Sequence, residues 1–487
     1  AIAVIWGWLP GLLWVFFGAV FIGGVHDFGA LVISIRARGM SVGKVAEAII
    51  GKRAKTLFHI LIFFLISFAM GVFILVISGL FADKHPEAVL PTFSLMGIAL
   101  VIGILTYRYG YSIGPLTVAA LAVCLVLVGV GLQVPVSGIS SETWSALLLV
   151  YCFLASVLPV WQLLQPRDYL NSFLLYIGLG SMFIGFFVLR PDFQAPMWDP
   201  APANAPSMFP FVFIVIACGA ISGFHGLVSS GTTAKQLNRE TDARFIGYGG
   251  MIGESLLGLL AVLACTAGFS SRESWANHYS DWALAGSLTQ KLGAFIDGAG
   301  LFIHQLGIPL PLAKAFVAFI AVSFALTSLD SATRLLRFNI TEMSETLHLP
   351  VLGNRYLASL LAVAAIGLFA FYRIDGEPAG LVLWQLFGTT NQVLGCLALL
   401  AITLYLFERR RPYLPTLVPM IFMLVTTVTA MFIKVKDFFR SGHTLLLVLG
   451  VAILILTLWL TGEAVHRLLR LRRERSGREV PDLFILP

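Results

Sequence analysis

The sequence predicts an all-α polytopic membrane protein with about 13 transmembrane helices. Of its 487 residues, 58% are hydrophobic and only 12% are charged, whereas a soluble domain carries roughly a quarter charged residues. Apolar runs of about twenty residues, enough to cross the hydrocarbon core of a bilayer, recur along the whole chain. Lysine and arginine also concentrate in alternate loops, as they do in multi-pass membrane proteins. The expected partner of most of the surface is therefore the lipid bilayer.

The apolar runs are separated by segments rich in charged residues, proline or glycine, and each run is expected to form one span. In chain order the spans are 1–25, 56–82, 91–109, 113–134, 143–165, 169–189, 207–231, 245–269, 311–337, 355–372, 379–407, 414–436 and 443–468. We expect a transporter core over 1–410, and a C-terminal helix pair with a basic cytoplasmic tail over 411–487. Because the chain opens inside an apolar helix, an N-terminal core helix is expected to lie upstream.

The basic residues predict the orientation of the spans. One set of alternate loops, together with the C-terminal tail, holds 23 of the 32 lysines and arginines. Cytoplasmic loops carry such an excess, so this set and the C-terminus are expected to be cytoplasmic. The same bias accounts for the net charge of +7, and no nucleic-acid partner is expected.

Two external segments are too irregular or too long for plain connectors. Residues 190–206 are rich in proline, and residues 270–310 contain an amphipathic pattern from Ala283 to Leu306. Whether this predicted helix gates the bundle or only lies on its surface is open. The five cysteines lie inside apolar runs and are expected to be buried hydrophobic residues, without disulfides or metal ligation: Cys124, Cys152, Cys218, Cys265 and Cys396.

The seventh span contains a run of glycines and polar residues that disfavours a continuous helix. Within 217–233 the small and polar residues are Gly219, Ser222, Gly223, His225, Gly226, Ser229, Ser230 and Gly231. Glycine costs about 1 kcal/mol per helical position relative to alanine. We expect the chain to unwind between about Gly219 and His225. A broken helix at mid-membrane would present its backbone groups to a substrate, as in secondary transporters, and Gly223 is expected to allow the substrate to approach closely. The alternative is close helix packing through Gly219 and Gly223, a G-x-x-x-G pair.

The ninth span carries a polar stripe. Ser323, Thr327, Asp330 and Arg334 recur at helical spacing on one face, and their oxygen atoms suit a proton or a sodium ion. The hydroxyls of Thr327 and Ser328 are the expected ion ligands. For Asp330 a second interpretation is open, namely an ion pair with Arg334 one turn further along.

Other polar residues inside spans are weaker candidates. Glu254 is an ionisable group within the eighth span, and such groups are expensive in lipid and often functional. The amides of Asn391 and Gln392 lie mid-span and suit either substrate binding or helix–helix contact. The pair His26–Asp27 is expected to close the first span at the membrane interface.

Several of these motifs resemble the carbon starvation protein A family, in the family's order and over essentially the whole chain. They are Gly-Trp-Leu-Pro-Gly at 7–11, His-Asp-Phe at 26–28, Leu-Gln-Pro-Arg-Asp-Tyr-Leu-Asn at 164–171, Gly-Ala-Ile-Ser-Gly-Phe-His at 219–225, Leu-Val-Ser-Ser-Gly-Thr-Thr at 227–233, Thr-Ser-Leu-Asp-Ser-Ala-Thr-Arg-Leu at 327–335 and Leu-Phe-Gly-Thr-Thr-Asn-Gln at 386–392.

The resemblance implies a secondary transporter of the bacterial inner membrane that imports peptides or pyruvate, with H⁺ or Na⁺ as coupling ion. It also implies leucine-transporter-like inverted repeats with extra helices. No catalytic residue, metal or cofactor is implied. The implied substrate-binding residues are Gly219, Ser222, Gly223, Phe224, His225, Asn391 and Gln392. The implied ion-coupling residues are Thr327, Ser328, Asp330 and Glu254. The family's first broken core helix would precede Ala1.

Other classes of membrane protein are an intramembrane enzyme, an ATP-driven pump, and a channel or nutrient sensor. The sequence has no H-E-x-x-H, no G-x-S-x-G and no paired-aspartate motif of the membrane-protease type, which disfavours an intramembrane enzyme. It has no G-x-x-x-x-G-K-[ST] loop, which disfavours an ATP-driven pump. A channel or a nutrient sensor remains an alternative, and saturation of flux and counterflow would distinguish either of them from a carrier.

Overall fold

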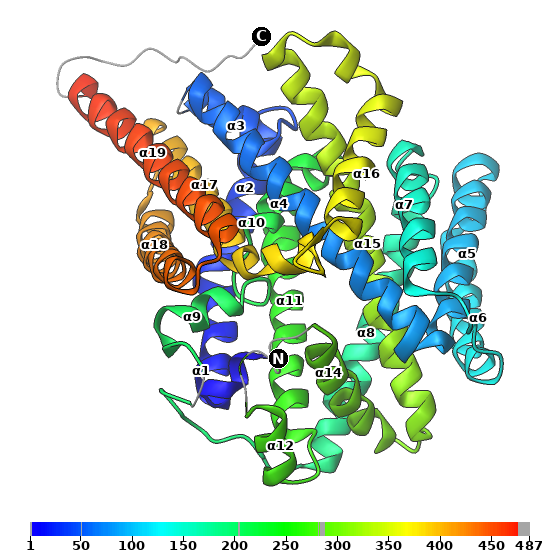
Figure 1. Cartoon of the computed structure of the whole chain (residues 1–487). Coiled ribbons are helices and arrows are strands. Elements are labelled where there is room, and N and C mark those ends of the chain that lie inside the picture. Colours follow the sequence, from blue (N-terminus) through cyan, green and yellow to red (C-terminus); the bar gives the residue numbers. More distant parts are fainter. Residues whose placement is uncertain (1, 50, 203–204, 281, 283–287, 476–487) are drawn as a thin grey trace.

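In the computed structural model, long helices run between two ends of the molecule (Figure 1). It describes the chain except for residues 1, 50, 203–204, 281, 283–287 and 476–487. The first helical stretch consists of η1 (Ile2–Trp6), α1 (Trp8–Leu13), the π-helical η2 (Trp14–Gly23) and α2 (Gly24–Arg36). From Trp8 to Arg36 the helix is continuous. It extends well past the predicted end at residue 25, because apolar residues continue from Phe28 to Ile35.

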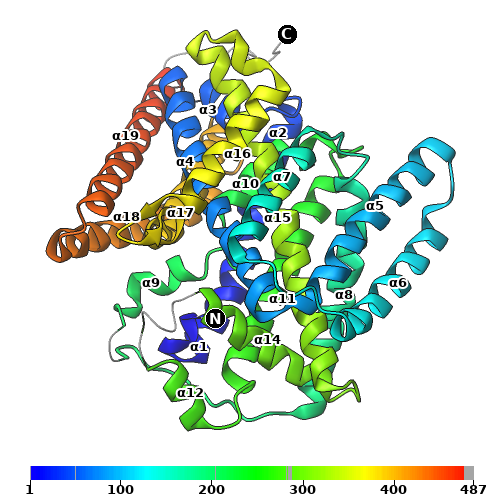
Figure 2. The same cartoon turned by 45° about the vertical axis from the view of Figure 1, so that its right-hand side comes forward.

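The next helices run from α3 and α4 to the α5–α6 pair, which lies at one side of the bundle (Figure 2). They are α3 (Val42–Ile49), α4 (Lys52–Gly79) with η3 (Leu80–Lys84), η4 (Pro86–Ala88), α5 (Val89–Tyr109), α6 (Ile113–Gln133), α7 (Ser141–Val157) and α8 (Leu164–Leu189). The described part of 190–206 contains no helix or strand, as its prolines predict.

The second half begins with two short helices in place of one span. They are α9 (Met208–Val215) and α10 (Gly223–Gly231). The elements that follow are η5 (Thr233–Lys235), α11 (Asp242–Ala267), α12 (Arg272–His278), α14 (Leu288–His304), α15 (Leu310–Leu347), η6 (Pro350–Gly353), α16 (Arg355–Phe371), the hairpin strands β1 (Arg373–Ile374) and β2 (Glu377–Pro378), α17 (Ala379–Glu408), α18 (Leu414–Ser441) and α19 (Thr444–Arg475). Helix α14 lies within the predicted amphipathic stretch, whose start at 283–287 is outside the described residues.

Among the described residues, 10 helices are long and apolar enough to cross a membrane, and Ser141–Val157 and Arg355–Phe371 are shorter apolar helices. Together with the broken pair α9–α10, they coincide with the predicted spans. A polytopic helical membrane protein is thus confirmed, while the count of thirteen crossings stays a prediction. Figure 1 places α3 and the C-terminal end of α19 at one end of the bundle, and α12 and α14 at the other.

Helix α17 is the central element, with 89% of its apolar window buried inside the protein. It packs against α2, α4, α10, α18 and α19. Helices α6 and α19, with 22% and 28% of their windows buried, leave apolar side chains on the outside, which suits contact with lipid rather than water. Helix α17 is therefore enclosed by other helices, and any site beside it is held from several sides.

A buried ion pair joins α8 to α15. The guanidinium of Arg167, which is 1% exposed, contacts the carboxylate of Asp330, which is 0% exposed. The hydroxyl of Tyr151 on α7 donates to the same carboxylate at 2.5 Å, and Arg167 also pairs with Asp168 at 2.8 Å. Removing one partner of a buried ion pair leaves the other charge buried and uncompensated, which destabilises the protein more than replacing both partners by apolar residues.

We therefore predict that Arg167→Ala destabilises the protein strongly. The expected cost is about 3–5 kcal/mol, seen as a lower midpoint of thermal unfolding in detergent. The control is Arg36→Ala, which removes a pair with Glu240 whose side chains are 48% and 45% exposed and which should cost about 1 kcal/mol or less. Equal shifts for the two variants would contradict the assignment of the Arg167–Asp330 pair as a structural clamp.

Candidate functional site

The seventh predicted span is interrupted between α9 and α10. Ile216 (φ −91°, ψ 83°) and Ser222 (φ −137°, ψ 130°) have non-helical backbones, and the helix resumes at Gly223. The predicted interruption of the helix is confirmed, but it spans residues 216–222 rather than 219–225. Gly223, Phe224 and His225 instead form the first turn of α10. We call residues 216–222 the break.

Side chains of neighbouring helices bond the backbone groups at the break. The indole Nε1 of Trp14 donates to the carbonyl of Ile216 at 3.0 Å. The amide Nε2 of Gln392 donates to the carbonyl of Phe213 at 3.1 Å, and the amide Oδ1 of Asn391 accepts from the backbone N–H of Phe224 at 3.0 Å. In lipid, unbonded backbone groups cost several kcal/mol each, so these three contacts are what allow the break to exist.

Asn391 also binds Ser222, and both side chains are completely buried. The Ser222 hydroxyl lies 3.0 Å from the Nδ2 atom of Asn391. Gly223 lies so close to α17 that an added Cβ would be 2.3 Å from the carbonyl oxygen of Asn391. The structure thus brings Ser222, Gly223 and Asn391 together as a helix–helix contact. The two interpretations of this span, a broken helix and close helix packing, therefore both apply, because the break ends at Ser222 and the next residue, Gly223, packs against α17.

A cavity of about 1120 Å³ adjoins the break. Of the predicted substrate-binding residues, only Gly219 lines it; its neighbours Ile216, Ala217 and Cys218 also do. An added Cβ at Gly219 would meet nothing closer than 3.4 Å, the Cα of Gly258. Ser222, Gly223, Phe224, His225, Asn391 and Gln392 are not among the lining residues. A substrate in the cavity could therefore approach the backbone closely at Gly219. It could not do so at Gly223, where the glycine pattern predicted the approach.

The cavity wall carries charged residues that the sequence analysis did not select. Three lysines and two aspartates line it: Asp83, Lys84, Lys291, Lys434 and Asp437. The Nζ of Lys434 contacts the backbone carbonyl of Gln385 on α17. The available signal was the position of Lys434 near the end of an apolar span, where an ionisable side chain is unusual. Lys291 lies on α14, so the amphipathic helix contributes to the cavity and does not merely lie on the surface.

His225 faces a carboxylate from the first helical stretch. Its Nδ1 lies 3.2 Å from an Oδ atom of Asp27, and the other Oδ atom lies 2.7 Å from Nδ1 of His26. Asp27 is 6% exposed and His26 0%. The expectation that this pair lies at the membrane interface is wrong, because α2 continues to Arg36 and buries the pair inside the bundle. The sequence signal was the apolar run after Asp27, which was not counted as part of the span.

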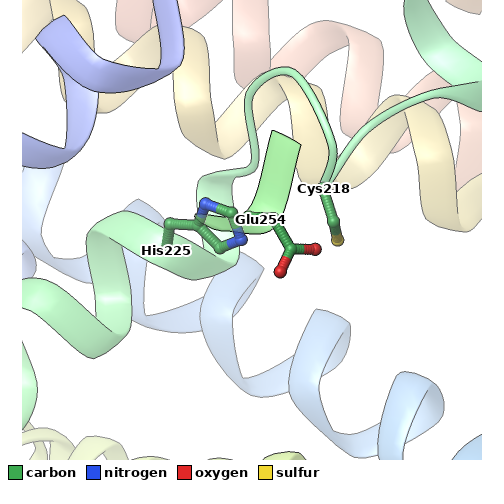
Figure 3. Close-up of side chains that lie close together, drawn as sticks. All are labelled: Cys218, His225 and Glu254. Carbon is green, nitrogen blue, oxygen red and sulfur yellow. The ribbon is translucent and has the colours of Figure 1, made fainter. Parts of the chain in front are cut away.

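Glu254, on α11, lies beside His225 and Cys218 (Figure 3). One ligand atom from each of the three side chains lies within 4.8 Å of the other two. The expectation that all five cysteines are buried is wrong for Cys218, which is exposed, whereas the other four are buried. The physical reason is that the break removes the helical neighbours that would cover its side chain. Glu254 and His225, chosen for different roles from the sequence, are thus neighbours.

The polar stripe of the ninth span contacts α7 and α8. The hydroxyl of Thr327 accepts from the Nδ2 of Asn171 at 2.7 Å and donates to the carbonyl of Ser323 at 2.9 Å. Ser328 is half-buried on the same helix. Asp330 does not pair with Arg334 but with Arg167. Arg334 instead donates to the carbonyls of Ala155 and Leu158 at 2.6 Å.

Comparisons with known proteins place the chain among transport proteins. It is 30% identical to the peptide transporter CstA of Bacillus subtilis (strain 168), covering 98% of this chain and 86% of that protein. It is 31% identical to the peptide transporter CstA of Campylobacter jejuni (86% and 68% covered). It is 30% identical to the pyruvate/proton symporter BtsT of Escherichia coli (strain K12), covering 88% and 70%.

Among solved structures, a manganese transporter of Eremococcus coleocola matches over 96% of this chain and 95% of its own, at 12% identity and a TM-score of 0.41. The model of the family described as carbon starvation protein CstA matches residues 1–305 and 273–430. The chain therefore belongs to the carbon starvation protein CstA family.

Proposed function

We propose that the chain is a secondary active transporter that imports small carboxylate-bearing nutrients, peptides or pyruvate, through the cavity at the break. The observation that carries the proposal is the cavity of about 1120 Å³ whose wall includes the non-helical backbone from Ile216 to Gly219. Irregular backbone at membrane depth is tolerated only where it is buried in protein or lines a cavity. Such breaks are where secondary transporters bind their substrates.

The charges of the cavity wall suit a substrate with a carboxylate. The lysines Lys84, Lys291 and Lys434 outnumber the aspartates Asp83 and Asp437. A peptide carries a carboxylate at one end and an ammonium group at the other. The lysines of the wall could bind the carboxylate, and the aspartates could bind the ammonium group. Pyruvate offers the carboxylate alone. The cavity volume of about 1120 Å³ lies slightly above the usual range for small-molecule sites, about 300–1,000 Å³, and this favours a peptide over pyruvate as the substrate.

The decisive experiment is uptake into proteoliposomes. Labelled di- and tripeptides and labelled pyruvate are offered separately, with an imposed proton or sodium gradient. We expect saturable uptake of peptides. Saturable uptake of pyruvate but not of peptides would support transport and contradict the preference for peptides. Uptake of neither substrate would contradict the proposed function.

The first variant to test is Gly219→Leu. Its side chain would project into the cavity beside the break, so we expect uptake to fall by at least tenfold, equivalent to about 1.4 kcal/mol, with membrane insertion intact. The matched control is Gly129→Leu on α6, where an added Cβ meets nothing within 4 Å. Normal uptake by the Gly219→Leu variant would show that the substrate does not pass beside the break.

We propose further that Thr327 and Ser328 bind the coupling ion, H⁺ or Na⁺. The support is chemical: hydroxyl oxygens suit hard cations, and the Thr327 hydroxyl is already held by Asn171 and by the Ser323 carbonyl. Asp330 is a weaker candidate than its sequence position suggested, because Arg167 neutralises it.

Thr327→Ala combined with Ser328→Ala is predicted to raise the cation concentration for half-maximal uptake by about tenfold, equivalent to about 1.4 kcal/mol of lost binding. The measurement is initial uptake rate against sodium concentration, and against pH. Thr341→Ala on the same helix removes a hydroxyl that only bonds the carbonyl of Arg337 and should leave the dependence unchanged. An unaltered cation dependence in the double variant would exclude the pair.

The family resemblance also implies inverted repeats, and we propose that the break opens the second of them. The order of elements supports this: the broken pair α9–α10 is followed by α11, by the amphipathic α14 and by α15. On the orientation given by the basic loops, the end with α12 and α14 faces outward and the C-terminus lies in the cytoplasm of a bacterial cell.

This orientation is testable by cysteine labelling. In a Cys218→Ser background, Ala276→Cys on α12 and Arg411→Cys between α17 and α18 place single exposed thiols at predicted opposite faces. A membrane-impermeant maleimide added to intact cells should label only the first, and both after the membrane is opened. Labelling of both in intact cells, or of Arg411→Cys alone, would refute the topology.

A further inference from the structure

The cluster of Cys218, His225 and Glu254 combines a thiol, an imidazole and a carboxylate at one point inside the membrane-spanning bundle. Each comes from a different part of the fold: the break, the first turn of α10 and α11. Their ligand atoms lie within 4.8 Å of one another. Tetrahedral zinc, with bonds of about 2.0–2.3 Å, needs ligand atoms about 3.5 Å apart. Cys218 is exposed and His225 and Glu254 are half-buried, so their side chains are less tightly packed than those of the core.

The hydrogen bonding of His225 leaves one ring nitrogen available toward the other two groups. With Nδ1 at 3.2 Å from Asp27, a neutral imidazole donates that N–H to the carboxylate and keeps its lone pair on Nε2. Figure 3 shows the other ring nitrogen turned toward the Glu254 carboxylate. Metal-binding histidines almost always have such a carboxylate or carbonyl behind them, which fixes the tautomer and orients the ring.

The remaining members are also placed as ligands. Cys218 is the exposed cysteine of the five and lines the cavity, so its thiol is accessible from solution. Among the described residues Glu254 has no ion-pair partner, although it lies within a membrane-spanning helix. A carboxylate and a thiolate together carry two negative charges, which a divalent cation would neutralise.

We propose that Cys218, His225 and Glu254 bind a divalent transition-metal ion of the zinc class, with Asp27 orienting His225. The thiolate favours zinc-like ions over the hard cations Mg²⁺ and Ca²⁺, which prefer all-oxygen sites. Three protein ligands leave a fourth position open, as in zinc sites that bind a further ligand. Cys218 is also part of the cavity wall. An ion bound there would stand in the substrate path, a consequence that rests on the proposed function.

The test measures binding and not transport, so it succeeds or fails independently of the proposed function. Purified, tag-free full-length protein in detergent is stripped of metal and titrated with Co²⁺, a coloured substitute for Zn²⁺. We expect one Co²⁺ per chain, a thiolate-to-cobalt charge-transfer band, and loss of the band when Zn²⁺ displaces cobalt. Zn²⁺ should also protect Cys218 of the unaltered protein from alkylation by maleimide.

Variants assign the ligands. Cys218→Ser should remove the charge-transfer band, and Glu254→Gln and His225→Asn should each weaken binding at least tenfold. Asp27→Asn should weaken it about 10- to 100-fold, the usual effect of losing a residue that orients a ligand. Cys124→Ser, a buried cysteine on α6, is the control and should change nothing. Absence of the band and of alkylation protection in the unaltered protein, or a band that survives Cys218→Ser, would overturn the proposal.

Discussion

Hydrogen bonding of the backbone inside the bilayer is the constraint on which the rest of this structure depends. The described helices meet it mainly through their own backbone hydrogen bonds, but between α9 and α10 the chain is not helical. There, side chains of other helices bond the backbone instead. Trp14 donates to the carbonyl of Ile216 and Gln392 to that of Phe213. Asn391 accepts from the N–H of Phe224. Two of these three come from α17, the most buried helix of the bundle. The break is therefore stable because α17 holds it, and an irregular segment without that partner would not persist in lipid.

This arrangement separates residues that hold the break from residues that face the cavity. Ser222, Gly223 and Asn391 are buried against one another, so their substitution would act on the geometry of the break. Gly219 and Cys218 lie on the other side of the same segment and line the cavity. The distinction matters for interpreting any variant in this region, because a loss of uptake at Gly223 would report on helix packing. A loss at Gly219, where there is room for a side chain, would report on access to the cavity.

The sequence predicted the helices and the break well, since each rests on a local rule. A span needs about twenty apolar residues, and a run of glycines and hydroxyls weakens the helix wherever it occurs. The partners of the polar residues were less predictable, because they depend on which helices become neighbours. For Asp330 the sequence left open an ion-binding role or a pair with Arg334 one turn away, yet it meets Arg167 from α8. The predicted interfacial position of Asp27 rests on a span that ends at residue 25, whereas the apolar residues up to Ile35 extend the helix and bury Asp27.

Exposure inside a membrane protein is the other property that hydropathy alone does not give. All five cysteines lie in apolar runs, and burial follows from that for the four that lie within continuous helices. Cys218 differs because the chain around it is not helical, so no adjacent turn covers its thiol and it opens to the cavity. The same break brings His225, at the first turn of α10, against Asp27 on one side and Glu254 on the other. One interruption of one helix thus accounts both for the non-helical backbone in the cavity wall and for the cluster of Cys218, His225 and Glu254 beside it.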